Sequence, residues 1–443
     1  MFRSNSRRAL GGVSLAAAAA LALTACGPAV GGDDAAADTA DLSGVEPADS
    51  ITFWTNHPGG SMDIEASLIE SFTEETGIEV EHVTAGSNYE EVAQRFQNGQ
   101  TSGDVGDVVV VSDATWFPAY LNGSLAPIDP LFEQAGADSA TYQETLFNDY
   151  LYEGSHYAAP YARSTPIFYY NKDQYEAAGL EVAGPATWDD VKANSEALVA
   201  AGAADTGFVF PEESEYPAWT MANLVWGYGG AWSDEWDFSP LDGEGTVNAL
   251  TFAQSAVTDG WAQVASGDPG TAFASGATSQ VIASTGSLTT ILENADFEVG
   301  VGFLPGGPEA DTGIVPTGGA GLAVASASSP EKQVAAAMFV DFVTNAENTA
   351  TYSAGTGYLP VRTDADMSDV YAETPAFEVA VQQLEATRSQ DFARAFLPGG
   401  DLRLAQTLQQ LLTGSDDVQT TLTSLREEFE GVYETDVAPE LEG

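Results

Sequence analysis

Strands and helices alternate along this chain from residue 50 onward, and this alternation limits the folds that the chain can adopt. Residues 50–55, 78–84 and 105–111 have the β-branched and aromatic composition of buried strands. Between them, residues 61–76 and 89–98 carry apolar side chains at helical spacing. Strand–helix–strand units of this kind predict a parallel sheet packed between helices.

The alternation continues over the rest of the chain. A chain of 443 residues is too long for one compact core, so two lobes are expected. Further strands are predicted at 165–171, 206–210, 280–285, 297–303 and 321–325, and further helices at 172–178, 188–201, 245–259, 288–295 and 330–344, followed by a mostly helical stretch over 366–436.

Residues 1–25 have the features of a secretory signal peptide. A basic end is followed by an Ala-rich apolar segment and then by small residues before Cys26. The four residues around the end of this region, Leu23 to Cys26, resemble the processing site of bacterial lipoproteins. That resemblance implies a lipid on Cys26 that anchors the protein to the outer face of the cell membrane. Residues 26–49 are rich in Gly, Ala and Asp and are expected to form a flexible linker.

Charge and motif content exclude several classes of function. The chain has 66 acidic and 13 basic side chains, and a net charge of -53 repels nucleic acid. One cysteine allows no internal disulfide, and three histidines without metal-ligand spacing indicate neither a metal nor another cofactor. The motifs of serine hydrolases, zinc proteases, P-loop enzymes and dinucleotide-binding enzymes are missing, so no enzyme is expected. A secreted hydrolase remains the alternative from another class.

Five short motifs occur in a characteristic order. They are Ile51–Trp54, Phe168–Lys172, Thr187–Trp188, Asn345–Asn348 and Thr356–Pro360. This series resembles the carbohydrate-type solute-binding proteins of bacterial ABC importers. The resemblance implies an α/β fold of the two-lobed periplasmic-binding-protein type (type II), with hinge strands and an interlobe cleft. It also implies a monomer that captures a small polar solute and passes it to permease subunits.

The same resemblance implies where the chain crosses between its lobes. One lobe is expected to contain residues 50–164 and 314–360. The other is expected to contain residues 165–313 and 361–443. Strand ends and helix N-termini of both lobes then meet at the cleft, which is where such folds bind ligands.

A closer resemblance, to the subfamily that binds glycerol-3-phosphate and glycerophosphocholine, implies a set of ligand contacts. It rests on Gly86–Glu90, Ser164–Lys172, Ala283–Leu288, Gly318–Ala320 and Thr356–Tyr358. The implied ligand-binding residues are Tyr89, Asp113, Ser164, Trp188, Ser284, Gly319, Tyr358 and Arg403. Asp113 stands where that subfamily has a longer Glu.

Each of these residues also has a structural interpretation. Asp113 could accept hydrogen bonds from ligand hydroxyls or cap the helix that follows it. Gly319 could admit a ligand to its backbone N–H or simply form a turn. Tyr89, Trp188 and Tyr358 could stack on a ligand or pack in the core. Ser164 and Ser284 supply small hydroxyl groups.

The arginines stand out because basic residues are scarce. An Arg fork forms bidentate bonds to phosphate, and the resemblance implies Arg403 as the phosphate ligand. The alternative for Arg403 is a surface ion pair with Asp401, and Arg163 is a second candidate cation. A neutral oligosaccharide or polyol is the alternative ligand, and aromatic residues suited to stacking on sugars are Trp54, Trp188, Tyr216, Trp219 and Trp226.

Overall fold

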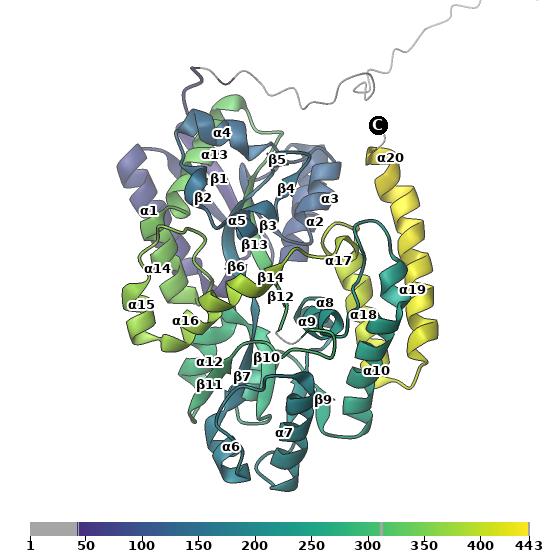
Figure 1. Cartoon of the computed structure of the whole chain (residues 1–443). Coiled ribbons are helices and arrows are strands. Elements are labelled where there is room, and N and C mark those ends of the chain that lie inside the picture. The colour runs from purple at the N-terminus through teal and green to yellow at the C-terminus, as the bar shows by residue number, and fades with distance from the viewer. Residues whose placement is uncertain (1–41, 43, 311–312, 442–443) are drawn as a thin grey trace, which may run out of the picture. The chain divides into compact units, whose positions relative to one another are not determined.

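The computed structural model describes residues 42, 44–310 and 313–441 (Figure 1). The predicted signal peptide and the predicted lipidation site Cys26 lie outside the described residues. So does most of the predicted linker. Within the described ranges, no helix combines the length and the apolar character needed to cross a membrane.

The first sheet has five strands in the order β2-β1-β3-β13-β6. β1 pairs in parallel with both β2 and β3, as predicted from the strand–helix alternation. β13 runs antiparallel to β3 and β6, so the sheet is mixed rather than wholly parallel. The strands are β1 (Ser50–Thr55), β2 (Glu79–Thr84), β3 (Val108–Ser112), β6 (Ala159–Ser164) and β13 (Gly318–Val324).

Helices cover both faces of this sheet. Along β3, Val108 and Val110 lie in one apolar cluster with Phe339, while Val109 and Val111 lie in another. Successive side chains of a strand point to opposite faces, so a strand of valines is buried on both sides. The surrounding helices are α1 (Met62–Thr76), α2 (Tyr89–Ser102), α3 (Trp116–Leu121), α4 (Ile128–Ala135), α5 (Glu144–Asn148), α13 (Pro330–Val343) and α14 (Ala346–Thr356).

The second sheet also has five strands, in the order β11-β7-β10-β8-β9. β7 runs antiparallel to its two neighbours, β10 and β11, whereas β8 is parallel to β10 and β9. The strands are β7 (Pro166–Asn171), β8 (Phe208–Phe210), β9 (Ala262–Val264), β10 (Gln280–Ser284) and β11 (Val299–Gly302). All but β9 were predicted.

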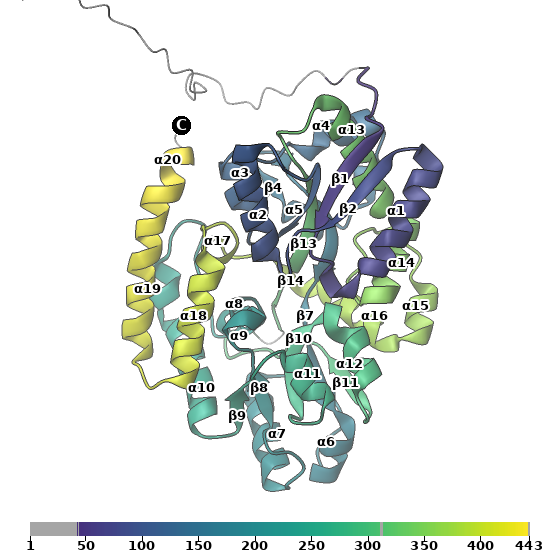
Figure 2. The same ribbon diagram turned by 180° about the vertical axis from the view of Figure 1, so that it is seen from behind.

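The helices that surround the second sheet and share its core come from two distant parts of the chain. Figures 1 and 2 show α18 and α19, near the C-terminus, running side by side next to α10. Their apolar residues Leu404, Leu425 and Phe429 join the same core as Trp188 and Phe208. The helices are α6 (Lys172–Ala178), α7 (Trp188–Ala200), α8 (Pro217–Thr220), α9 (Ala222–Gly227), α10 (Glu244–Thr258), α11 (Pro269–Ala274), α12 (Leu288–Asn294), α15 (Ser368–Glu373), α16 (Pro375–Gln382), α17 (Phe392–Ala395), α18 (Gly400–Thr413), α19 (Val418–Val432) and α20 (Ala438–Leu441).

Short strands lie close to the points where the chain passes between the two sheets. The first sheet ends at β6, and after Thr165 the chain enters β7 of the second sheet. Farther along, β12 (Val315–Pro316) pairs with β14 (Thr387–Arg388) just before the chain returns to the first sheet as β13. A two-residue hairpin pairs β4 (Leu151–Tyr152) with β5 (Ser155–His156).

Candidate functional site

A cavity of about 190 Å³ lies where strand ends of the two sheets approach one another. Ser112, Ser164 and Ser284 are the last residues of β3, β6 and β10, and all three line it. Carboxyl ends of strands are the usual place for ligands in α/β proteins. The other lining residues are Tyr89, Glu90, Asp113, Ala114, Glu215, Tyr216, Trp219, Thr220, Asp268, Pro269, Ile282, Ala283, Ser287, Gly319, Tyr358, Arg394 and Asp401.

Six of the eight ligand contacts implied by the sequence come together around this cavity. They are Tyr89, Asp113, Ser164, Ser284, Gly319 and Tyr358. In sequence they extend from the start of α2 to the end of α14. Their convergence makes this cavity the candidate site.

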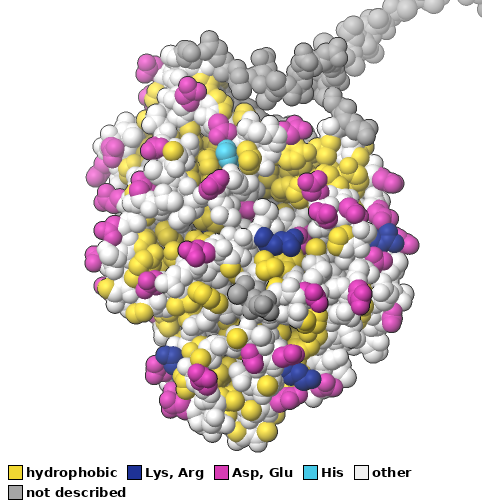
Figure 3. Space-filling view, viewed as in Figure 1, with side chains coloured by type: hydrophobic (Ala, Val, Ile, Leu, Met, Phe, Trp, Pro, Cys, Tyr) yellow, Lys and Arg dark blue, Asp and Glu magenta, His cyan; other side chains and the backbone are white. Residues whose placement is uncertain are grey.

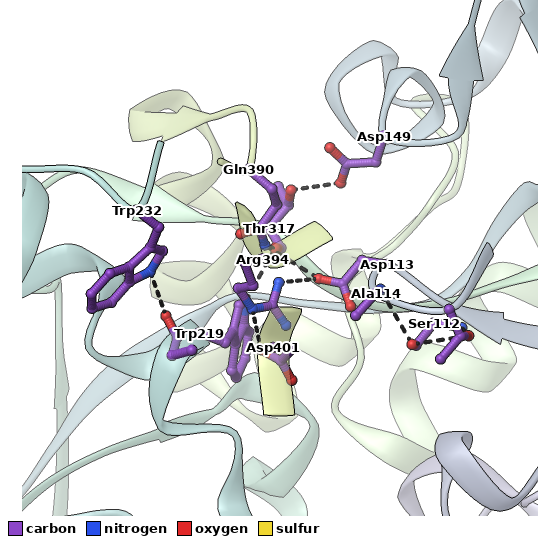
Figure 4. A network of polar contacts seen from close by, with 12 residues as sticks. Ser112, Asp113, Ala114, Asp149, Trp219, Trp232, Thr317, Gln390, Arg394 and Asp401 are labelled. Atoms are coloured by element: carbon purple, nitrogen blue, oxygen red, sulfur yellow. Dashed lines mark hydrogen bonds and ion pairs between the residues drawn. The ribbon is translucent and has the colours of Figure 1, made fainter. Parts of the chain in front are cut away.

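A buried ion-pair network forms one wall of the cavity. Arg394, only 3% exposed, donates from Nη1 to Asp113 Oδ2 at 2.7 Å. Figure 4 shows Arg394 lying between Asp113 and Asp401, with Gln390 also reaching Asp113 at 3.2 Å. Burial opposes the charge of the Arg394 guanidinium, but the carboxylates of Asp113 and Asp401 raise its pKa above the ordinary value. The guanidinium therefore keeps its positive charge.

Asp401 is the second carboxylate partner of Arg394. Arg394 Nε and Asp401 Oδ1 form an ion pair at 2.8 Å. Burial raises the pKa of the Asp401 carboxyl, and the nearby Asp113 charge adds to this against the opposing effect of Arg394. Asp401 thus completes the ion-pair network in this wall of the cavity.

Aromatic side chains form another part of the wall. Tyr89, Tyr216, Trp219 and Tyr358 line the cavity, and the Trp219 Nε1 donates to the carbonyl of Thr317 at 3.1 Å. That bond fixes the plane of the indole ring. These four rings supply faces that could contact an apolar or cationic part of a ligand.

Gly319 fits its position because of both its conformation and its surroundings. Its φ is +100°, and a Cβ atom there would lie 2.1 Å from the carbonyl oxygen of Ala162. Its own carbonyl accepts a hydrogen bond from the Asp113 N–H at 3.0 Å. A glycine is therefore required to keep β13 against β6 and to hold Asp113 at the cavity.

Trp188 lies away from the cavity. Its side chain is 2% exposed, and its Nε1 donates to Asn223 Oδ1 at 3.0 Å. It opens α7, where Thr187 and Asp190 form a capping box, and its ring packs edge-on against Phe208. Trp188 therefore packs in the core and does not line the cavity.

Arg403 also lies away from the cavity. Its Nε donates to Glu428 Oε1 at 2.7 Å, and its side chain is about one-third exposed. The expected alternative, an ion pair with Asp401, is wrong in its partner because Asp401 pairs with Arg394. Arg403 therefore ties α18 to α19. Arg163 pairs with Asp149 and donates to the Tyr150 hydroxyl at 2.8 Å, behind the cavity wall.

The most informative residue that sequence reasoning missed is Arg394. Basic residues are scarce in this chain, which has only 13 Lys and Arg residues, and that scarcity is the one sequence signal that could have drawn attention to Arg394. No local motif marks it, because its partner Asp113 is 281 residues away. Of the five aromatic residues proposed for sugar stacking, Tyr216 and Trp219 line the cavity and Trp54, Trp188 and Trp226 do not.

Comparison with known proteins identifies related sequences over most of the chain. Residues 67–379 match the family described as bacterial extracellular solute-binding proteins. The chain is 25% identical over 414 residues to the sn-glycerol-3-phosphate-binding periplasmic protein UgpB of Pectobacterium atrosepticum, covering 86% of this chain and 90% of that protein. It is 26% identical over 370 residues to UgpB of Escherichia coli strain K12, covering 77% and 82%.

Solved structures include similar proteins. UgpB from Mycobacterium tuberculosis in complex with glycerophosphocholine is 39% identical, with a TM-score of 0.82 over 88% of this chain and 99% of that one. The GacH receptor of Streptomyces glaucescens is 20% identical, with a TM-score of 0.76 over 87% and 98%. The second likeness shows the fold alone. Together they confirm the expected two-lobed α/β fold of the periplasmic-binding-protein type.

Proposed function

The chain belongs to the bacterial extracellular solute-binding protein family, and we propose that its cavity captures glycerol-3-phosphate or a glycerophosphodiester. Members of this family are substrate-binding receptors of ABC importers that work outside the cytoplasm, so the protein is a receptor and not an enzyme. What the receptor carries is the subject of the proposal.

The observation that carries the proposal is the buried guanidinium of Arg394 at the cavity. Among the described residues that line the cavity, it is the only Lys or Arg. A phosphate or phosphodiester oxygen would find a charge-assisted donor there, with the Ser164 and Ser284 hydroxyl groups nearby. Arg394 replaces Arg403 in the proposal because Arg403 is engaged with Glu428 at the surface.

The charge of the cavity favours the diester over the monoester. Its lining includes five carboxylate side chains, which disfavour a ligand that carries two negative charges and has no cation. A glycerophosphodiester with a quaternary ammonium head bears one negative and one positive charge. Carboxylates and aromatic faces such as Tyr216 and Trp219 suit that cation. The carboxylates are Glu90, Asp113, Glu215, Asp268 and Asp401.

The 39% identical structure supports the same choice, since it is UgpB from Mycobacterium tuberculosis in complex with glycerophosphocholine. An oligosaccharide or polyol remains the second candidate. Its support is the combination of aromatic rings and hydrogen-bonding carboxylates, which would also suit hydroxyl groups. The two candidates differ in their need for Arg394.

The lobe boundaries belong to the same proposal. We assign residues 50–164 and 314–360 to one lobe and residues 165–313 and 361–443 to the other. Support comes from β13, which pairs within the first sheet, and from Leu404 and Phe429, which pack with the second. The cavity then lies between the lobes, where closure can bury a ligand.

Calorimetric titration of the purified protein with glycerophosphocholine, glycerol-3-phosphate and maltose tests the ligand assignment. We expect binding of glycerophosphocholine in preference to the other two. The Arg394→Lys variant keeps the positive charge but loses the fork, and should weaken phosphoester binding at least about tenfold.

The matched control is Arg403→Ala, which removes a surface arginine and should leave affinity unchanged. Loss of binding in the Arg403 variant, with Arg394→Lys unaffected, would return the phosphate site to Arg403. Binding of maltose alone would support the oligosaccharide candidate instead. The receptor role rests on the family and does not depend on either result.

A further inference from the structure

Two of the three histidines meet at one carboxylate, and none of these residues lines the candidate cavity. His57 follows β1, Glu65 lies on α1 and His82 lies on β2. The His57 Nδ1 is 2.6 Å from Glu65 Oε2, and the His82 Nε2 is 3.0 Å from the same oxygen. The sequence offered no metal-ligand spacing, but the parallel pairing of β1 and β2 brings the two rings together.

The surroundings hold this cluster in one geometry. Glu65 is 2% exposed, and its other oxygen, Oε1, accepts hydrogen bonds from Thr55, Ser61 and Tyr161 at 3.0–3.2 Å. Oε2 is thereby left facing the imidazoles. His57 has a left-handed backbone with φ of 56°, which is uncommon for a residue other than glycine.

Hydrogen bonds and packing also orient the two rings. The His57 Nε2 is 2.7 Å from Thr84 Oγ1, a partner that can accept its N–H and leave the Nδ1 lone pair toward Glu65. The His82 ring lies parallel to Phe53, with an interplanar angle of 6°. Metal-binding histidines characteristically donate their second N–H to such a partner.

We propose that His57, Glu65 and His82 bind a divalent transition-metal ion, with zinc favoured. The three ligand atoms lie within 4.8 Å of one another. Two imidazoles and one carboxylate form a ligand set that zinc uses, with its fourth position open to water. Tetrahedral bonds of about 2.0–2.1 Å place ligand atoms roughly 3.3 Å apart, so the two nitrogens, now 2.6 and 3.0 Å from Glu65 Oε2, need to move away from that oxygen by less than about 1 Å.

The position of the cluster suggests what the ion stabilises. His57 precedes Pro58–Gly60, a turn whose Gly59 packs against the Tyr358 ring. The Pro58 carbonyl accepts a hydrogen bond from the Tyr352 hydroxyl at 3.2 Å. A metal bridging three elements would therefore fix the turn that supports Tyr358, independently of which ligand the cavity takes.

Zinc titration of EDTA-treated, tag-free protein tests the site. Calorimetry and elemental analysis should give one zinc ion per chain. His82→Ala should weaken zinc binding by more than about tenfold, because loss of a residue that only hydrogen-bonds to a metal ligand already lowers metal affinity about tenfold or more. His156→Ala is the matched control, because His156 pairs with Asp129 elsewhere, and it should bind zinc like the wild type.

Cobalt provides a measurement on the unaltered protein. Bound Co²⁺ should give the intense visible absorption of a tetrahedral site, and added zinc should remove it. Failure of the wild type to take up zinc would overturn the proposal. So would zinc binding that survives intact in a folded His57→Ala, His82→Ala double variant, with folding checked by circular dichroism in EDTA.

Discussion

Burial distinguishes Arg394, which the sequence did not nominate, from Arg403, which it did. Arg394 and Arg403 are nine positions apart, yet the first is 3% exposed and the second about one-third exposed. A buried guanidinium must be paired, and the two carboxylates beside Arg394 meet that need. A ligand phosphate would compete with Asp113 and Asp401 for the N–H groups of Arg394. Ligand binding therefore requires this ion-pair network to rearrange.

Gly319 gives the clearest single-residue prediction for stability. Gly319→Ala should lower the free energy of unfolding by about 3 kcal/mol, because a Cβ would add steric overlap with the Ala162 carbonyl to a strained positive φ. Urea denaturation measures this. The matched control is Gly154→Ala, whose φ of +83° is similar but whose Cβ would meet no atom within 4 Å. Its cost should be only about 1–2 kcal/mol, and equal losses in both variants would contradict the role given to the Ala162 contact.

At the scale of elements, the spacing of apolar residues predicted several of the longer strands and helices. β1, β3, α1, α10 and α13 begin and end within a few residues of their predicted limits. It missed the three-residue β9, whose pattern is too brief to read, and also the six-residue β6 and the 11-residue α14, which carry few large apolar side chains. The antiparallel course of β13 was also missed, since strand direction depends on the path of the chain between sheets.

Asp129 connects α4 to β5, and this contact predicts how the stability of the protein depends on pH. It lies in the first turn of α4 and accepts hydrogen bonds from the backbone and ring of His156 on β5, at 2.7 and 2.9 Å. Partial burial would raise the pKa of the Asp129 carboxyl, but these bonds hold it below the ordinary value. The stabilisation is therefore present above pH ~4 and is lost as the pH falls through the lowered pKa.

Asp129→Asn should thus lower the free energy of unfolding by about 0.5–1 kcal/mol at pH 7 and have little effect near pH 2. Denaturant titrations at several pH values measure the difference. Asp173→Asn is a suitable control, since Asp173 also lies in the first turn of a helix but accepts no side-chain hydrogen bond within the described residues. A loss for Asp129→Asn that persists unchanged at pH 2 would show that the His156 contact is not its source.

At the scale of the whole molecule, acidity is the dominant feature. Acidic side chains are spread over the face shown in Figure 3, and basic ones occur at only a few places on it. A net charge of -53 keeps such a surface solvated. We propose that the protein is monomeric and is held at the outer face of the cell membrane by lipidated Cys26, from the sequence of residues 1–26.

The anchor can be tested in cells. Cys26→Ala should move the protein from the membrane fraction to the culture medium or periplasm, because a lipid chain would no longer be attached. Fractionation and immunoblotting measure the distribution, and mass spectrometry of the wild type should find the lipid on Cys26. Gly27→Ala, a neighbouring change that keeps the cysteine, is the control and should stay with the membrane. An unmodified Cys26 in the mature protein would overturn the proposal.

The sequence by itself determined the strand–helix alternation and the main helix limits, and six of the eight ligand contacts that it implied lie at the cavity. The elements follow from the local periodicity of apolar residues, and the contacts follow from ordered motifs in the sequence. Only the tertiary structure decided that Arg394, rather than Arg403, reaches Asp113, and that Trp188 belongs to the core. It also brought His57 and His82 onto Glu65. Such pairings depend on strand register and on how distant segments pack, and neither is encoded in the spacing of residues along the chain.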